Sequence, residues 1–166
     1  MKQTIDDVNM DRRTVLRGAG ALAVSGVLAG CGGGGGDNGN GGGDGDGDGV
    51  PSEVSSYLDG ANNFDGSVVD ETDTDSVTVM VGAGSANLAF DPAAVRVSTG
   101  TTVTWEWTGN GGGHNVVAED GTFKSGDEFV SEAGFTDDHT FEEAGNYNYY
   151  CAPHKGSGMK AAVIVE

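Results

Sequence analysis

The clearest hydrophobic pattern in the chain is a strict alternation over residues 101–107. Val103, Trp105 and Trp107 fall on one face of an extended strand, and the residues between them are polar. Further strands are predicted in short segments bounded by Gly, Asp, Asn or Pro, at residues 68–69, 76–81, 94–97, 114–118, 137–142, 147–151 and 160–165. About eight short strands with no strong interior helix predict an all-β sandwich.

One short helix is predicted ahead of the strands, over residues 51–58. Ser52 is its expected N-cap, and Val54, Tyr57 and Leu58 would share one face. Residues 62–66, Asn-Asn-Phe-Asp-Gly, are then predicted as a turn. We therefore assign residues 51–166 to a single folded domain.

The first 30 residues have the pattern of an export signal. Arg12 and Arg13 precede an apolar run over residues 18–30, which is too short for a bilayer that needs about 20 residues. A paired arginine before such a run is typical of a twin-arginine signal peptide. The run ends at Cys31 in Leu-Ala-Gly-Cys, which resembles the lipobox of lipoproteins. We expect cleavage before Cys31 and lipidation of its thiol; the alternative is an ordinary signal peptide with an incidental Cys.

A linker is predicted over residues 31–50. Twelve of residues 32–49 are Gly and the others are Asp or Asn, so the segment cannot bury a core. We expect a flexible coil with an end-to-end distance of roughly 25 Å. Residues 44–49 match the first half of a calcium loop, but Ser55 stands where that loop has a bidentate Glu, so a solvated linker is favoured over a calcium site.

The charge of the chain is strongly negative. Asp and Glu number 26 against 8 Lys and Arg, which gives a net charge of -18. This balance excludes nucleic-acid binding, which needs a basic surface. Acids spread over the surface would suit a protein in concentrated salt; an acidic docking face for a cationic partner is the other interpretation.

Four residues form a candidate metal site: His114, Cys151, His154 and Met159. The last three have the spacing C-x2-H-x4-M, and His114 lies in a Gly-Gly-Gly-His-Asn segment upstream. Two imidazoles, a thiolate and a weak axial thioether are the ligand set of a blue-copper site, and a rigid β-frame would keep the geometry similar in Cu(I) and Cu(II). Zinc is disfavoured because Met is a poor fourth ligand. We predict one copper ion.

Each of these residues alone has a structural interpretation. A single Cys is most often a small buried hydrophobe and a single Met is core filler, so the prediction depends on the four residues occurring together. The remaining histidine, His139, has no such company, and we expect it to be structural or to face solvent, on the same side of its strand as Phe141.

The segments Asn-Tyr-Tyr-Cys-Ala-Pro-His at residues 148–154, Gly-Met at 158–159 and Gly-His-Asn-Val-Val at 113–117 resemble the plastocyanin family of cupredoxins. With the export signal, the lipobox and the acidic composition, the chain is most similar to the membrane-attached blue copper proteins of haloarchaea within it. The resemblance covers roughly residues 52–166. It implies a Greek-key sandwich of eight strands with the copper near one end.

The resemblance also implies a role for each site residue. His114 and His154 would be equatorial ligands, Cys151 the thiolate and Met159 the axial ligand. His154 would be the entry point for electrons, and Asn115 would support the site from behind the ligands. Relatives often carry Ser or Thr directly after the Cys, whereas this chain has an Ala, so a hydroxyl link between the two ligand loops is missing there.

We therefore predict a one-electron carrier rather than an enzyme. It would be exported, anchored by lipid to the outer face of the cell membrane, monomeric, and reactive with membrane-bound donor and acceptor proteins. Three histidines are too few for a multicopper oxidase. A copper storage or delivery protein is the alternative, although such proteins usually repeat exposed Cys or Met sites.

Overall fold

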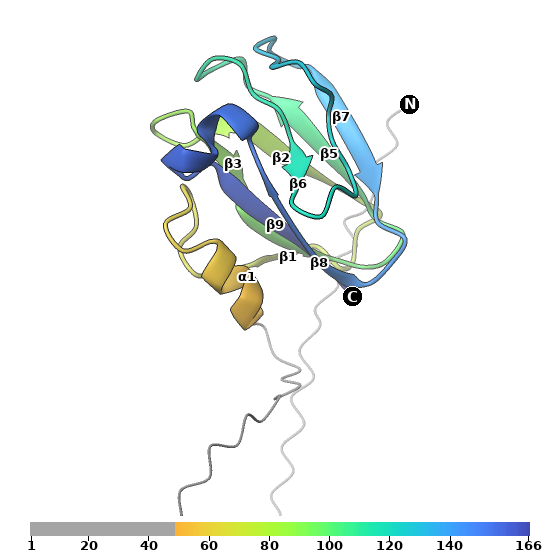
Figure 1. Ribbon diagram of the computed structural model, residues 1–166. Helices are drawn as coiled ribbons and strands as arrows, with labels where there is room; N and C mark the ends of the chain where they lie inside the picture. Colours follow the sequence, from red (N-terminus) through yellow and green to blue (C-terminus); the bar gives the residue numbers. More distant parts are fainter. Residues whose placement is uncertain (1–48) are drawn as a thin grey trace, which may run out of the picture. The chain divides into compact units, whose positions relative to one another are not determined.

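The computed structural model describes residues 49–166, so the predicted signal peptide, Cys31 and nearly all of the predicted linker lie outside the described residues. Residues 49–166 form nine strands in two sheets that pack face to face (Figure 1). The five-stranded sheet has the order β1-β4-β9-β8-β6, and the four-stranded sheet has the order β3-β2-β5-β7. The predicted all-β sandwich is confirmed. Over the same residues, no helix has the length and apolar character needed to cross a membrane.

Most predicted strands occur close to their expected positions. The strands are β1 (Val69–Asp70), β2 (Ser76–Ala83), β3 (Ala89–Asp91), β4 (Ala94–Val97), β5 (Thr102–Trp107), β6 (Val117–Ala118), β7 (Thr136–Thr140), β8 (Gly145–Tyr150) and β9 (Lys160–Val165). The prediction missed β3, which is too short to show an alternation. It also extended β6 too far, because His114 pairs with Val130 in an isolated bridge and not in a continuous ladder.

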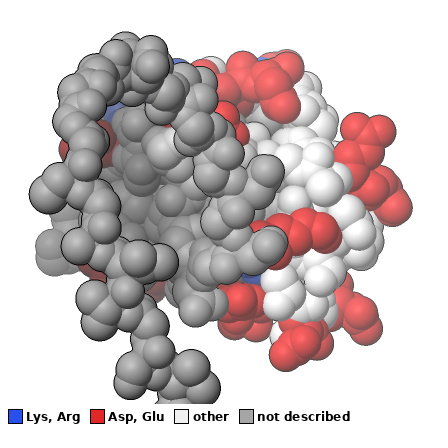
Figure 2. All heavy atoms as spheres, turned by 90° about the horizontal axis from the view of Figure 1, so that it is seen from below, with Lys and Arg blue, Asp and Glu red and all other residues white. Residues whose placement is uncertain are grey.

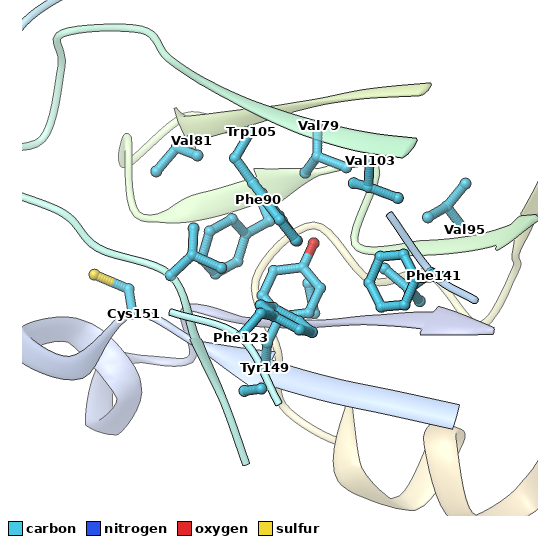
Figure 3. Close-up of a cluster of buried hydrophobic side chains, with 14 of the residues drawn as sticks. Val79, Val81, Phe90, Val95, Val103, Trp105, Phe123, Phe141, Tyr149 and Cys151 are labelled. Carbon is cyan, nitrogen blue, oxygen red and sulfur yellow. The ribbon is translucent and has the colours of Figure 1, made fainter. Parts of the chain in front are cut away.

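The main core lies between the two sheets. Val103, Trp105 and Trp107 of β5 are buried and the intervening residues are partly exposed, as the alternation predicts. Figure 3 shows the cluster between the sheets, with Cys151 at one end and Phe141 at the other. The thiol of the candidate site is therefore part of the same packed interior that holds the sheets together.

A second, smaller core attaches the helix to the outside of the five-stranded sheet. Helix α1 (Ser52–Tyr57) buries Val54, and Leu58 at its C-cap is also buried, in a cluster that includes Ala94, Ala162 and Ile164. The predicted N-cap is wrong: Pro51 occupies that position, and no side chain caps the helix. The carbonyl oxygen of Ser52 instead accepts hydrogen bonds from two serine hydroxyls of the helix.

The strands give the sandwich two distinct ends. Strands β8 and β9 are antiparallel, so Tyr150 pairs with Lys160 at one end, which we call the donor pole, and Gly145 pairs with Val165 at the other. Acidic residues gather at this second end, which we call the acidic pole: Asp70, Glu71, Asp73, Asp75, Glu142, Glu143 and Glu166. Figure 2 views the molecule from below, the side of the C-terminus, and shows acidic side chains across the visible part of that face.

Candidate metal centre

Three donor atoms converge at the donor pole. Cys151 Sγ lies 3.6 Å from His114 Nδ1 and 3.5 Å from His154 Nδ1, and the two Nδ1 atoms are 3.1 Å apart. Within residues 49–166, these three side chains form the one group of His, Cys and carboxylate residues that could hold a metal ion. The structure thus brings together residues separated by 37 positions in the sequence.

The spacing of these atoms fits a single bound ion. Nitrogen and sulfur ligands lie about 2.0–2.3 Å from an ion such as Zn²⁺, so three of them around one ion are roughly 3–4 Å apart. The three separations observed fall in that range. A thiolate with two imidazoles also favours copper among the first-row metals. The donor set present therefore fits one copper ion.

Hydrogen bonds to both the main chain and the ring of His114 fix its position. Its N–H and C=O both pair with Val130 at 2.8 Å, and Trp107 Nε1 donates to His114 O at 3.2 Å. The ring nitrogen Nε2 is 2.9 Å from Asn110 O, so the proton resides on Nε2 and the lone pair of Nδ1 faces Cys151. The tautomer required of a ligand is therefore set by the chain itself.

One glycine of β2 leaves the room that His114 needs. Gly82 has a φ of 82°, and a Cβ there would lie 2.6 Å from Asn110 O and 3.1 Å from His114 Nε2. A larger residue would push against both partners of the hydrogen bond that orients the imidazole. Sequence analysis missed this glycine and Asn110, because one contributes space and the other only a main-chain oxygen. For Trp107, the sequence predicted a place on one face of a strand and not a hydrogen bond to His114.

The other ligand candidates come from the loop between β8 and β9. Cys151 directly follows β8, and Ala152–Ser157 form the 3₁₀ helix η1. The N–H of Cys151 donates to Met159 O at 3.1 Å, and the N–H of His154 donates to Cys151 O at 3.1 Å. Cys151 and Met159 are fully buried in the main core, whereas His154 is half-buried. One donor of the group therefore reaches toward solvent.

Asn115 links the two segments that carry the donors. Its Oδ1 accepts a hydrogen bond from Ala152 N at 2.8 Å, and Asn115 is itself 2% exposed. The two ligand segments are thus linked without a hydroxyl after the Cys, because the main-chain N–H of Ala152 donates the hydrogen bond. Asn115 therefore connects the segment of His114 with the segment of Cys151 and His154.

Burial controls the protonation of the site. Desolvation raises the pKa of the Cys151 thiol, although hydrogen bonds with main-chain groups act in the opposite direction. Desolvation also lowers the pKa of His114, and the nearby imidazole of His154 adds to that effect. Both shifts favour the uncharged forms of these two groups, a protonated Cys151 thiol and a neutral His114 imidazole.

The charge around the donors differs from that of the chain as a whole. Residues 107–118 and 151–159 contain no acid, and their one charged side chain is Lys155. Lys155 pairs with Glu119 and lies over the Tyr150 ring, 3.8 Å from its centroid. The neighbouring residues 127–132 carry three acids, so acidic side chains begin again close to the donor segments in the sequence.

The remaining histidine lies elsewhere. His139 of β7 packs between Phe123, at 5.2 Å between ring centroids, and Phe141, at 4.9 Å. It is half-buried on the same side of β7 as Phe141. This is the structural role that the sequence favours, and it leaves His114 and His154 as the imidazoles of the site.

Known proteins match the part of the chain that contains the candidate site. Residues 77–166 match the model of a family described as copper binding proteins, plastocyanin/azurin family. Halocyanin from Natronomonas pharaonis is 50% identical over 161 residues, which cover 95% of this chain and 99% of that protein. Plastocyanin from Scenedesmus fuscus is 36% identical over 99 residues, 54% of this chain and 99% of that protein. A solved structure of a mutant fern plastocyanin has 25% identity and a TM-score of 0.44, and the match covers 54% of this chain and 100% of that one.

Proposed function

Because the chain belongs to the plastocyanin/azurin family of copper-binding proteins, we propose that it carries single electrons at a membrane, with one copper ion held by His114, Cys151, His154 and Met159. It is a blue copper electron-transfer protein. The ligand assignment, the tether and the route of the electron are the parts that we add.

The observation that carries the ligand assignment is the convergence of three donor atoms, two of which belong to buried side chains. Cys151 is fully buried and His114 is 1% exposed, and both are held by hydrogen bonds from the surrounding strands and loops. Met159 is buried beside them and is bonded through its main chain to Cys151. When bound, copper supplies the one-electron change between Cu(I) and Cu(II). A frame that holds the same geometry for both states keeps the reorganisation small.

We assign the electron entry point to His154. It is the one ligand of the four that is not buried, and the side chains on its N-terminal side, Ala152 and Pro153, are exposed. An electron that passes through His154 crosses one imidazole between solvent and the ion, whereas any other ligand would add a longer path through packed side chains. The two small exposed residues also let a partner surface approach closely.

The entry point can be tested by blocking it. Ala152→Glu places a charged, longer side chain beside His154, and Ser98→Glu adds the same charge at the acidic pole. We expect Ala152→Glu to slow oxidation of the reduced protein by an anionic inorganic oxidant about tenfold or more, with the Ser98 variant near the wild-type rate. Equal rates in the two variants would place the entry point elsewhere.

The tether proposed for residues 31–50 starts at a lipidated Cys31. Gly49, the first described residue, accepts a hydrogen bond through its carbonyl oxygen from Arg96 Nη2 at 2.8 Å, on the strand that ends at the acidic pole. A linker that precedes Gly49 would therefore join the domain away from the donors and leave the donor pole free for partners. Export and anchoring on the outer face of the membrane complete this proposal.

The tether is tested by Cys31→Ala in the native host. We expect the variant to appear in the medium or to accumulate as an unprocessed precursor, while the wild type stays with the membrane fraction. Mature variant protein in the membrane at the wild-type level would contradict lipidation at Cys31. The copper site of the variant should be unchanged, which separates this test from that of the ligands.

A carrier is favoured over an enzyme or a copper store by the number and burial of the donors. A multicopper oxidase needs several copper sites, and residues 49–166 offer one cluster. A store or delivery protein must release its ion, whereas two of the three clustered donors are buried. Loss of copper to a competing chelator should therefore be slow compared with electron exchange; release as fast as exchange would favour storage or delivery.

A further inference from the structure

The loop that carries three of the four proposed ligands is held from outside at both ends. At its start, Asn115 Oδ1 accepts a hydrogen bond from Ala152 N. At its end, the contacts come from the turn that follows α1, about a hundred positions earlier in the chain. The middle of the loop is η1, a 3₁₀ helix, whose hydrogen-bond geometry is poorer than that of an α-helix. The external contacts therefore decide where the loop sits.

Asn62 makes two hydrogen bonds to the end of this loop and a third to the segment between β2 and β3. Its main-chain N–H donates to Gly158 O at 2.8 Å. Its side-chain Nδ2 donates to Ser157 O at 2.8 Å and to Leu88 O at 2.7 Å, so both hydrogens of the amide have an acceptor. Asn62 thus joins the ligand loop to the connection between β2 and β3.

Close packing reinforces these bonds at Gly158. This residue has a φ of 86°, and a Cβ there would lie 2.7 Å from Gly60 O and 3.2 Å from Asn62 Oδ1. The turn and the loop are therefore in contact through a position that only glycine fits. Met159 follows directly, and its N–H donates to His154 O at 3.2 Å. A displacement of Gly158 would move Met159 and loosen its bond to His154.

The turn is a firm support because α1 is well anchored. Lys160 Nζ donates to Tyr57 O at 2.7 Å and to Asp59 O at 3.1 Å, and the Tyr57 hydroxyl donates to Tyr149 O at 3.0 Å. The small core around Val54 fixes the helix to the sheet. The segment lies outside residues 77–166, so it is not part of the region that matches the family model.

We propose that Asn62 is a positioning residue of the copper centre, which fixes Met159 relative to Cys151 and His154 from outside the family domain. This inference rests on the proposed function. A thioether is a weak, long axial ligand, so the chain rather than the ion sets its position, and the reduction potential responds to that position. Asn62 and Asn115 then clamp opposite ends of one ligand loop.

The test compares Asn62→Ala and Asn62→Asp with a control, Val97→Ala, in the full copper-loaded protein. Val97→Ala removes buried volume at the acidic pole, where Val97 pairs with Val165, away from both the ligand loop and the turn after α1. Asn62→Ala removes two side-chain donors; Asn62→Asp keeps the shape but points a carboxylate at two carbonyl oxygens. The measurements are the visible spectrum, the reduction potential, the melting temperature, and amide hydrogen exchange at Gly158 and Met159 in the copper-free protein.

We expect both Asn62 variants to change the relative affinity for Cu(I) and Cu(II) by about threefold, which is about 30 mV for a one-electron couple. Exchange at Gly158 and Met159 should rise about tenfold in the copper-free protein, a readout that needs no metal. Val97→Ala should lower the melting temperature at least as much, with an unchanged potential, because it leaves a cavity in the main core far from the ligand loop. If Asn62→Ala does not fold, Asn62→Ser, which keeps one donor, replaces it.

A wild-type spectrum without an intense visible band would contradict the proposed function itself. A normal wild-type spectrum with unchanged potential and exchange in the Asn62 variants would overturn only the role of Asn62. A potential shift in Val97→Ala as large as that in the Asn62 variants would also overturn it, because the effect would then follow from lost stability alone.

Discussion

The donor pole and the acidic pole lie at opposite ends of the same strands, yet they differ in charge and in packing. The donor segments, residues 107–118 and 151–159, contain no acid, and their functional atoms are mostly buried. The acidic pole carries seven acidic residues, and two of them pair with a largely buried cation, Arg96, whose side chain is 8% exposed. The donor segments carry Lys155 as their one charged side chain, whereas the acidic pole carries many charged side chains.

This difference indicates how a highly acidic chain can carry its Cys and His donors in segments that contain no acid. Arg96 pairs with Glu166 at 3.0 Å and with Asp70 at 4.0 Å, which compensates part of the charge at the acidic pole. The strands between the poles keep those carboxylates a strand's length from the donors. Changes at the donor pole should therefore alter copper chemistry, and changes at the acidic pole should alter stability alone.

The largest expected effect is at the donor pole, from Cys151→Ser. Loss of the thiolate should abolish the intense visible band and weaken copper binding by more than about a hundredfold, because losses behind the ligands alone cost 10–100-fold. The free energy of unfolding of the copper-free protein should fall by only about 1–2 kcal/mol, since a hydroxyl of similar size is buried beside two imidazole acceptors. Spectra and denaturant titrations measure both. Retention of the colour would refute the site.

At the acidic pole, Arg96→Met should have the opposite pattern, a loss of stability with unchanged copper chemistry. This variant should lose about 1–2 kcal/mol of unfolding free energy at low salt, because a buried donor to Gly49 O and two ion pairs disappear while the carboxylate partners stay hydrated. Part of the loss should vanish in concentrated salt. The reduction potential, measured by voltammetry, should not change. A shift in reduction potential as large as that of a ligand variant would contradict the idea that the acidic pole affects stability alone.

A finer change at the donor pole is Met159→Leu. The substitution conserves volume, so the loss of stability should stay below about 1.5 kcal/mol. Removal of a weak donor to Cu(II) should raise the reduction potential by on the order of 60 mV, a tenfold change in the relative affinity for the two oxidation states. Voltammetry on the copper-loaded variant measures this shift. An unchanged potential would mean that Met159 is packed beside the ion without binding it.

The last prediction concerns pH, which should also act at the donor pole. Because burial raises the pKa of the Cys151 thiol, the copper-free site is protonated near pH 7, and copper must displace that proton. The pKa of His114 is lowered, so this imidazole is already neutral and releases none. Apparent copper affinity should therefore rise about tenfold per pH unit between about pH 7 and 8.5. Competition titrations with a chelator measure the slope; an affinity independent of pH would contradict a protonated thiol.

The sequence predicted the frame well where periodicity is strong. Strand β5 and the strands at 94–97 and 160–165 follow from alternating or continuous apolar residues, and Val54 and Leu58 follow from helical spacing. The three residues of β3 have too little pattern of their own. Ser52 has the right side chain for an N-cap, but the chain enters the helix through Pro51 with an extended backbone, which only coordinates reveal.

The donor side chains of the candidate site could be predicted from the sequence, but the residues that hold them in place could not. His114, Cys151 and His154 are recognisable because few other functions combine those side chains at that spacing, and the structure brings their donor atoms together. Asn110 and Ala152 act through main-chain atoms, which any residue type provides. Asn62 is an ordinary turn residue in the sequence, and its contacts with the ligand loop depend on how α1 docks.

The most direct test of the copper assignment is an optical redox titration of the protein loaded with copper. Four ligands around one ion predict a stoichiometry of one copper per chain, an intense thiolate-to-copper band in the oxidised form, and complete, reversible bleaching on addition of one electron. A band that persists after reduction, a stoichiometry other than one, or copper bound without colour would contradict a centre formed by Cys151 with His114 and His154.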